Sequence, residues 1–349
     1  MLRRLTGRLL EGAASAVDRA ARNAVEAGLS RRAPSRLTLS HAARVAFLER
    51  LAHEYDCDPQ TFHEEPPRIE PVSRSGRDDR GRTVLDLAWP STVRPYLEPF
   101  AERYLEAPEN RIAATRLLTR VRPRPVAVLV HGFLSGHFAL EQRLWPIDEL
   151  DRLGFDVALF VLPFHGVRAA PGRQAPEFPG IDPRFTNEGF RQAVFDLRAL
   201  VRALYERGHP EVGVLGMSLG GYTAALAATV EPRLAFVVPV IPLACLADFS
   251  REQGFLVGSP DEVATLHRLL ERVHRVVSPF AGPSRVPRER VLVVGARADR
   301  ITPIAHARRI ARHCGAELFA FRGGHLLQLG RRESFERVFA LLERVRDGT

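Results

Sequence analysis

The 349-residue sequence contains no lysine, so its formal charge of +9 comes from 50 arginines set against 41 acidic residues. Together with abundant Ala, Gly and Pro, this composition indicates a GC-rich coding bias. The excess of basic over acidic residues is therefore weak evidence for a function. Beyond the first fifty residues, no block of arginines with interleaved aromatic residues stands out. We therefore do not expect the protein to bind nucleic acid.

Cysteine and long apolar runs are also scarce. Cys57, Cys245 and Cys314 form an odd, widely spaced set, which excludes a disulfide framework and favours a reducing, cytoplasmic setting. No apolar run reaches 18 residues, and Arg8 and Glu11 interrupt the apolar core that a signal peptide needs. We expect a cytoplasmic protein without a transmembrane helix.

Residues 2 to 29 have the periodicity of an amphipathic helix. Small and apolar residues recur at Leu2, Leu5, Leu9, Ala13, Val17, Ala20 and Ala24. Because this stripe is mostly alanine, we favour packing against the body of the protein, or disorder. The alternative is a peripheral contact of residues 1 to 30 with an anionic membrane surface, which the neighbouring arginines permit.

The chain divides at about residue 82. Residues 1 to 82 are predicted to be an N-terminal helical extension and connector, with a helix from Ser40 to Tyr55 capped by Ser40 and an irregular, Pro- and charge-rich connector at 57 to 82. Residues 83 to 349 are predicted to form one α/β domain.

Strands and helices alternate in this second part, as is typical of a doubly wound sheet. The predicted strands are Thr83 to Leu87, Arg111 to Leu118, Val126 to Val130, Phe155 to Leu162, Glu211 to Gly216, Leu234 to Val240, Val291 to Val294 and Glu317 to Phe321. The predicted helices are 138 to 153, 188 to 208, 219 to 230, 303 to 313 and 332 to 346. Residues 243 to 290 break the alternation and are interpreted as an inserted helical lid.

Ser218 lies between an apolar strand and an Ala-rich helix, in the stretch VGVLGMSLGGYTAALAA. Gly216 and Gly220 flank it at the G-x-S-x-G spacing, which allows a helix to double back tightly on a strand and leaves the serine exposed as a nucleophile. The amide of Leu219 is then placed at a helix start as an oxyanion-hole donor. The pattern also arises by chance in flexible turns, and the strand before it and the helix after it favour the catalytic interpretation.

The strand Val126 to Val130 runs into the sequence HGF, a glycine-containing loop suited to present a backbone amide. We predict Phe133 N–H as the second oxyanion donor, with Leu134 as the alternative. His131 is predicted to shape this loop by hydrogen bonding. His137 and His165 are predicted near the cleft mouth, where each is either functional or a packing residue.

Two further motifs supply a carboxylate and an imidazole. Asp299 follows the strand in VLVVGARADRITP, and His325 follows Gly323 and Gly324 at the end of another strand. Asp299 is alternatively a loop or capping residue, although Thr302, before Pro303, is the better candidate for a helix cap. The order Ser, Asp, His along the chain matches that of a serine hydrolase with an α/β sheet.

Metal and cofactor motifs are not found. The sequence has no H-E-x-x-H, no cysteine pair, no P-loop and no dinucleotide-binding fingerprint, so we predict neither a metal nor a cofactor. His267, Glu271 and His274 fall at helical spacing, and we interpret them as part of a solvated polar face rather than as ligands.

The motifs LVHGF, GMSLGG, GARADRITP and GGHLLQLGRR together resemble the alpha/beta-hydrolase superfamily over about residues 83 to 349. PFHGVR, with the serine turn, also resembles the alpha/beta hydrolase domain-containing protein 18 branch. The resemblance implies an eight-stranded, mostly parallel sheet with helices on both faces. It also implies Ser218 as nucleophile, His325 as base and Asp299 as the residue that orients the imidazole.

The function that we predict is therefore hydrolysis of a carboxylic ester or thioester through an acyl-enzyme. Apolar residues in the lid suit a lipid-like acyl substrate: Phe249, Phe255, Leu256, Val257 and Leu266. An acyltransferase with the same triad, or a non-catalytic binding protein of the same fold, are the alternatives. The sequence does not predict the oligomeric state.

Overall fold

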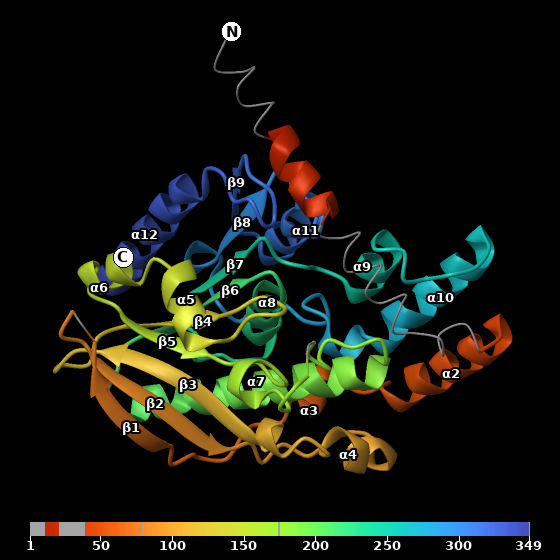
Figure 1. Cartoon of the computed structure of the whole chain (residues 1–349), viewed down its shortest axis with the longest axis horizontal. Coiled ribbons are helices and arrows are strands. Elements are labelled where there is room, and N and C mark those ends of the chain that lie inside the picture. The colour runs from red at the N-terminus through yellow and green to blue at the C-terminus, as the bar shows by residue number, and fades with distance from the viewer. Residues whose placement is uncertain (1–10, 21–38, 79, 174, 349) are drawn as a thin grey trace, which may run out of the picture.

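The computed structural model describes residues 11–20, 39–78, 80–173 and 175–348. At its centre is a sheet of nine strands in the order β1-β2-β3-β5-β4-β6-β7-β8-β9 (Figure 1). The strands are β1 (Val72–Arg77), β2 (Thr83–Pro90), β3 (Ile112–Thr119), β4 (Val126–Val130), β5 (Asp156–Phe160), β6 (Val212–Met217), β7 (Val237–Val240), β8 (Leu292–Ala296) and β9 (Glu317–Phe321). The pairs β1–β2, β2–β3 and β3–β5 are antiparallel, and the strands from β5 to β9 in the sheet are parallel.

Helices cover both faces of this sheet. Besides the helical residues 11–20, the described α-helices are α2 (His41–Glu54), α3 (Pro59–Phe62), α4 (Glu98–Tyr104), α5 (Phe138–Leu144), α6 (Ile147–Arg152), α7 (Pro183–Glu206), α8 (Leu219–Val230), α9 (Leu246–Glu252), α10 (Pro260–Val273), α11 (Ile304–Cys314) and α12 (Arg331–Asp347). Among them, α7 and α8 lie on one face of the sheet, and α6 and α12 lie on the other. Alternate residues of β4 enter different cores. Val128 packs in the core shared with α7, α8 and α11, and Leu129 packs in the core shared with α6 and α12.

The predicted alpha/beta-hydrolase fold is confirmed, and the bounds predicted for β4, β9 and α8 are those of the structure. Other bounds are shifted, as in α7, which begins at Pro183 rather than at residue 188, and α4 was not predicted. Larger details also differ. The predicted connector at 57–82 contains α3 and β1, and β1 gives the sheet nine strands rather than eight. The helix predicted at 138–153 is two helices, because Pro146 separates α5 from α6.

The amino-terminal helix prediction can be compared with the structure only at residues 11–20, which are helical, because residues 1–10 and 21–29 lie outside the described residues. The predicted apolar stripe is wrong in this segment. Ala13, Val17 and Ala20 are exposed, whereas Ala14, Ser15 and Asp18 are buried against the rest of the protein. The packing interpretation is therefore confirmed for these ten residues, on a different face of the helix, and the membrane contact stays a prediction.

The insertion between β7 and β8 contains α9 and α10 (Figure 1). Helix α10 packs against α9 and against α2, and its residues Leu266, Leu270 and Val273 belong to the main hydrophobic core. Leu266, which we predicted to contact an acyl chain, is therefore a core residue. Val257 in the same insertion is exposed. The function of the insertion as a lid stays a prediction.

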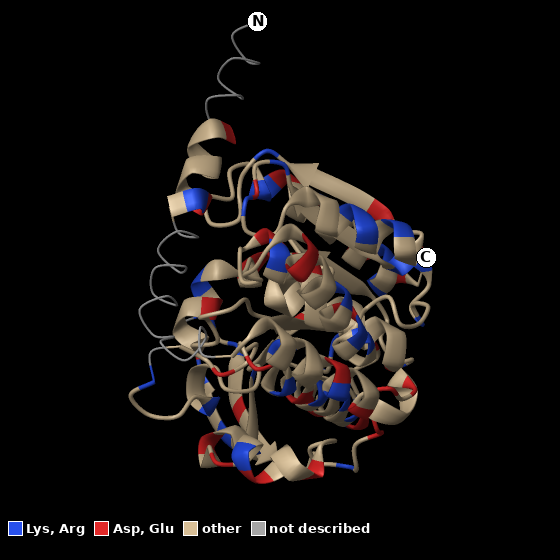
Figure 2. Ribbon diagram, turned by 90° about the vertical axis from the view of Figure 1, so that its right-hand side faces the viewer, with Lys and Arg blue, Asp and Glu red and all other residues tan. Residues whose placement is uncertain are grey.

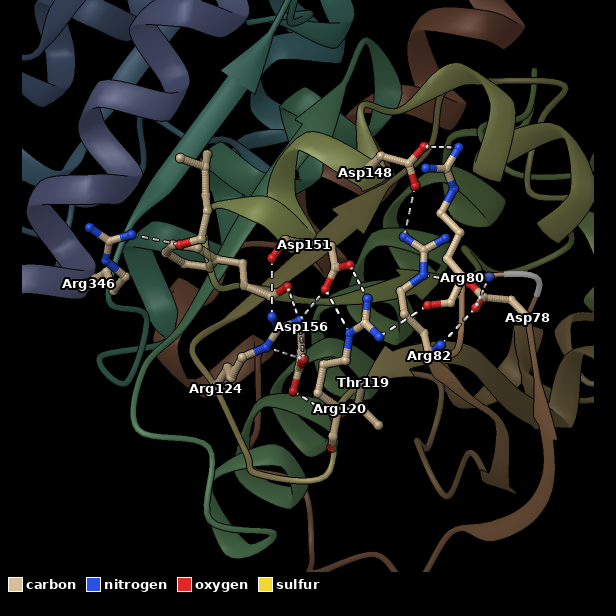
Figure 3. Close-up of polar contacts among 12 residues, drawn as sticks. Asp78, Arg80, Arg82, Thr119, Arg120, Arg124, Asp148, Asp151, Asp156 and Arg346 are labelled. Atoms are coloured by element: carbon tan, nitrogen blue, oxygen red, sulfur yellow. Dashed lines mark hydrogen bonds and ion pairs between the residues drawn. The ribbon is translucent and has the colours of Figure 1, made fainter.

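The amino ends of β4 and β5 carry a network of ion pairs (Figure 3). Arg124 Nε donates to Asp156 Oδ1 over 2.9 Å, and Arg124 Nη2 donates to Asp151 Oδ1 over 2.8 Å. Hydrogen bonds from Arg120, and then from Arg124, lower the pKa of Asp151 to about 2. A hollow lined by several arginines, including Arg77 and Arg122, lies at this same edge. These arginines are thus at the edge of the sheet opposite to the carboxyl ends of the parallel strands.

Basic and acidic residues lie intermingled along the helices in Figure 2. Within the described part of the chain, none of the helices is long and apolar enough to cross a membrane.

Candidate active site

Four loops leave the sheet at the carboxyl ends of its parallel strands. Ser218 follows β6, Asp299 follows β8, His325 follows β9, and the loop with Phe133 follows β4. Because these strands are parallel, all four loops emerge at the same edge of the sheet. This is the edge at which ligands bind in open α/β sheets.

Ser218 occupies a strained turn between β6 and α8, with φ 55° and ψ −110°. The flanking glycines are required by space. A Cβ on Gly216 would lie 1.9 Å from Gly220 O, and a Cβ on Gly220 would lie 2.1 Å from Val130 O. The N–H of Ser218 donates to Val240 O over 2.9 Å, which ties the turn to the neighbouring strand β7.

The hydroxyl of Ser218 is half-buried and makes no hydrogen bond with a described residue. Gly132 lies against it, since a Cβ built there would be 3.6 Å from Ser218 Cβ. Among the residues that the structure describes, the N–H groups of Leu219 and Phe133 have no acceptor. The two predicted oxyanion donors thus have no hydrogen-bond partner within the described part of the chain, and their role stays a prediction.

Asp299 and His325 form a hydrogen-bonded pair. His325 Nδ1 lies 2.8 Å from Asp299 Oδ2, so that Nδ1–H donates to the carboxylate and Nε2 is left as the basic nitrogen. The other oxygen, Oδ1, accepts from the backbone N–H groups of Ile301 and Thr302 over 2.8 and 2.7 Å. Asp299 is 3% exposed, and its orientation is fixed by these three donors.

Thr302 is the first residue of the site that the sequence did not predict. Its hydroxyl is 3.0 Å from His325 Nδ1, 3.1 Å from Asp299 Oδ2 and 3.0 Å from Ile241 O. The expectation that Thr302 caps the following helix is wrong. Pro303 occupies the N-cap position of α11, and no side chain caps this end.

The structure thus joins two of the three predicted triad members directly. No hydrogen bond links Ser218 and His325 in the described contacts, and Gln328 connects their two segments instead. Its Nε2 lies 2.9 Å from His325 O and 3.7 Å from Met217 Sδ. Bonds between nucleophile and base are often long without substrate, so this geometry is compatible with a catalytic relay.

The comparisons with known proteins agree with this architecture. Residues 124–252 match the family model described as "Alpha/beta hydrolase domain containing 18". An acetyl xylan esterase from Thermoanaerobacterium sp. JW/SL YS485 has a similar structure, with a TM-score of 0.52, 16% identity and coverage of 85% of this chain and 92% of that one. An acetyl xylan esterase from Paenibacillus sp. R4 gives a TM-score of 0.52 at 15% identity, covering 85% and 93%. The chain therefore has the alpha/beta-hydrolase fold.

Sequence relatives match a longer part of the chain than the family model does. An uncharacterized protein of Mycobacterium tuberculosis, found in two strains, is 30% identical over 275 residues. The match covers 76% of this chain and 66% of the relative, just under two thirds of the relative's length.

Two buried histidines lie beside the loop that follows β4. His131 Nδ1 donates to Gly132 O over 2.8 Å and its Nε2 accepts from Leu162 N–H over 3.1 Å, as predicted for a residue that shapes the loop. Burial lowers the pKa of His131, and it lowers the pKa of His165 to about 3. The His165 ring packs edge-on against Phe133 at 5.9 Å, which favours the packing interpretation for this histidine. His137 is exposed at the start of α5.

Glu141 holds the far end of the same loop and is also absent from the sequence prediction. Its buried carboxylate accepts from Ser135 Oγ, from Gly136 N–H over 3.0 Å and from Trp145 Nε1 over 3.0 Å. The signal in the sequence is weak, because a glutamate in a short helix is usually exposed.

The histidines of α10 are not on a solvated face, contrary to our expectation. His267 Nε2 is 2.8 Å from Asp248 Oδ1, and buried His274 Nδ1 is 2.7 Å from Asn187 Oδ1. Ligand atoms of Cys245, Asp248 and Glu271 do lie within 4.8 Å of one another. Arg251 and Arg309 already pair with Asp248, so this group is better explained as an ion-pair cluster than as a cation site.

Exposed apolar side chains border the catalytic loops. Phe133 and Leu134 follow β4 and are 40% and 54% exposed, and Leu326 and Leu327 follow His325 and are 55% and 37% exposed. Two of the loops at this edge of the sheet therefore present large apolar side chains to solvent.

Proposed function

We propose that this protein is a serine hydrolase that cleaves a carboxylic ester or thioester through an acyl-enzyme. The observation that carries the proposal is the strained, unpaired Ser218 at the same sheet edge as the hydrogen-bonded pair of His325 and Asp299. The fold alone would not suffice, since one fold serves many functions.

In the first half-reaction, Ser218 Oγ attacks the carbonyl carbon and His325 Nε2 takes the hydroxyl proton. The resulting oxyanion is bound by the N–H groups of Leu219 and Phe133. When the tetrahedral intermediate collapses, the bond to the leaving alcohol or thiol breaks and His325 returns the proton to it. A water molecule then attacks the acyl-enzyme by the same route, which releases the acid and restores Ser218.

Asp299 acts on the imidazole rather than on the substrate. By accepting a hydrogen bond from Nδ1–H, it leaves Nε2 free to act as the base, and its charge stabilises the imidazolium that forms during each half-reaction. The two backbone donors on Oδ1 keep this carboxylate in place.

The substrate class follows from the exposed apolar side chains. Phe133 and Leu134 lie on the oxyanion side, and Leu326 and Leu327 lie on the histidine side, so an acyl chain bound between the two loops would cover apolar surface on both. We therefore propose an acyl group with a hydrocarbon chain. The structural neighbours act on acetyl xylan by their titles, which makes a short acyl group the alternative that the assay must separate.

The decisive experiment is labelling with a fluorophosphonate probe. The wild type should be labelled and the Ser218→Ala variant should not, because the probe reacts with an activated serine. Ser73→Ala, which removes an exposed hydroxyl on strand β1, is the matched control and should label as the wild type does. Equal labelling of wild type and Ser218→Ala would refute the assignment.

Hydrolysis rates over a series of p-nitrophenyl esters, from acetyl to lauroyl, then define the acyl group. A maximum of kcat/KM at the longer chains supports the hydrocarbon-chain proposal, and a maximum at acetyl contradicts it. Product analysis with an added alcohol separates hydrolysis from acyl transfer, since a transferase forms the new ester in place of the free acid.

A further inference from the structure

Residues 11–20, the red helix in Figure 1, lie against the two loops that carry Asp299 and His325. The contact face consists of Ala14, Ser15 and Asp18, all of which are buried. Ser15 Oγ donates to the backbone oxygen of Ala298 over 2.9 Å.

The Asp18 carboxylate binds both loops at once. Oδ2 accepts from the N–H of His325 over 2.7 Å and from the N–H of Arg300 over 3.1 Å, and Oδ1 accepts from the N–H of Leu326 over 3.0 Å. Asp18 is fully buried, with 0% of its surface exposed. Because burying a carboxylate is costly unless its oxygens are hydrogen-bonded, these three donors are what makes the position of Asp18 tolerable.

Gly324 provides independent support for a specific fit. A Cβ at this position would lie 2.6 Å from Asp18 Oδ2 and 3.2 Å from Ala14 O. The residue before the histidine therefore has to be small for the helix to approach. Gly324, the second glycine of the GGH sequence, thus makes room for Asp18.

We propose that Asp18 is a positioning residue for His325, an inference that rests on the proposed hydrolase function. Asp299 and Thr302 hold the imidazole of His325 through its Nδ1. A backbone bond from Ala298 N–H to Gly323 O over 3.0 Å also joins the two loops, two residues before the histidine. Asp18 binds the backbone nitrogen of His325 itself, and so fixes the backbone position from which the imidazole side chain extends. Proton transfer from Ser218 depends on this placement, since small errors in the position of a base slow the reaction strongly.

The test compares Asp18→Asn with Glu11→Gln, a carboxylate-to-amide change on the same helix whose side chain makes no described contact with the loops. In Asp18→Asn an NH₂ group replaces one acceptor and faces a backbone donor. We expect kcat for the best p-nitrophenyl ester to fall by about 100-fold, the scale of a 1 Å misplacement, with KM unchanged. We also expect faster amide hydrogen exchange in residues 322–327. Glu11→Gln should match the wild type in all three measurements.

Gly324→Ala is the second variant, because it displaces the carboxylate without removing it and covers the case in which Asp18→Asn does not fold. The same loss of kcat with faster exchange in residues 322–327 supports the proposal. Amide hydrogen exchange in residues 322–327 that stays as in the wild type would overturn the proposal. Faster exchange in these residues together with an unchanged kcat would overturn it as well. A wild type that neither reacts with fluorophosphonate nor hydrolyses esters would instead refute the proposed function, and the positioning role would fail with it.

Discussion

Replacing Arg168 by methionine is expected to destabilise the protein strongly, because it breaks an ion pair from which solvent is excluded. Arg168 and Asp196 are both 0% exposed, and Arg168 Nη2 lies 2.8 Å from Asp196 Oδ2. The guanidinium also donates to Val161 O over 3.1 Å and to Asn110 O over 3.0 Å. Asp196 Oδ1 keeps one other partner, the hydroxyl of Ser91 at 2.6 Å.

The magnitude follows from these contacts. Three hydrogen bonds are lost, and leaving a buried acceptor unpaired costs about 1 to 3 kcal/mol. Asn110 O still accepts from Gln192 Nε2 over 2.9 Å, so Val161 O and the Asp196 carboxylate bear most of the loss. We expect Arg168→Met to lower the free energy of unfolding by about 3 to 5 kcal/mol, the range for breaking a buried ion pair. The double variant Arg168→Met/Asp196→Leu should cost less than the single variant, because no unpaired charge remains.

The effect should also depend on pH. Burial is the largest influence on Asp196 and raises the pKa of its carboxyl above the ordinary value, although Arg168 opposes this. Without Arg168 the folded-state pKa rises further above the unfolded one, so the variant is most stable where the carboxyl is protonated and loses stability as the pH rises. Urea unfolding at pH 5 and pH 7 measures both effects, with Arg288→Met, at an exposed ion pair, as the control. A single variant within about 1 kcal/mol of the wild type at pH 7 would refute the reasoning.

Two further variants test the turn and the buried histidines. Gly220→Ala is expected to abolish fluorophosphonate labelling, because the new Cβ would lie 2.1 Å from Val130 O. Gly282→Ala is the control and should be labelled normally, since no atom lies within 4 Å of a Cβ at that position. Labelling of both variants would contradict this prediction. Burial lowers the pKa of His274 to about 3, so its contribution to stability is complete above pH 6.5 and is lost as the pH falls towards 3. In urea unfolding from pH 7 to pH 5, His274→Gln should reduce the total change of stability with pH by about 2 kcal/mol, since the full slope of about 1.4 kcal/mol per pH unit is reached only below pH 6.5. An unchanged slope would show that His274 is not buried in its neutral form.

Much of the central sheet could be predicted because its strands are short apolar runs bounded by glycine or polar residues. The strands β4 and β9 and the helix after Ser218 have the predicted bounds for this reason. Strand β1 could not be found in this way. Its residues VSRSGR are all exposed, and the strand is held by backbone pairing with β2 rather than by an apolar face.

The predicted site residues lie in sequence motifs, whereas their hydrogen-bond partners lie in segments that carry no motif. Asp299 and His325 stand at strand ends with glycines nearby, a pattern that is visible in the sequence. Thr302 and Asp18 contact His325 only after folding, and Asp18 lies 307 positions away from it in the chain. No periodicity marks a carboxylate whose partners are backbone N–H groups of distant loops, so its role becomes visible only in three dimensions.

The residue before Ser218 gives access to this site by spectroscopy. The sequence contains two methionines, Met1 and Met217, and Met1 lies outside the described residues. Met217 Sδ lies 3.7 Å from Gln328 Nε2, between the serine turn and the histidine loop. Isotope labelling of methionine methyl groups would therefore place one NMR probe between these two segments without any substitution, and its chemical shift would report the acylation that we propose.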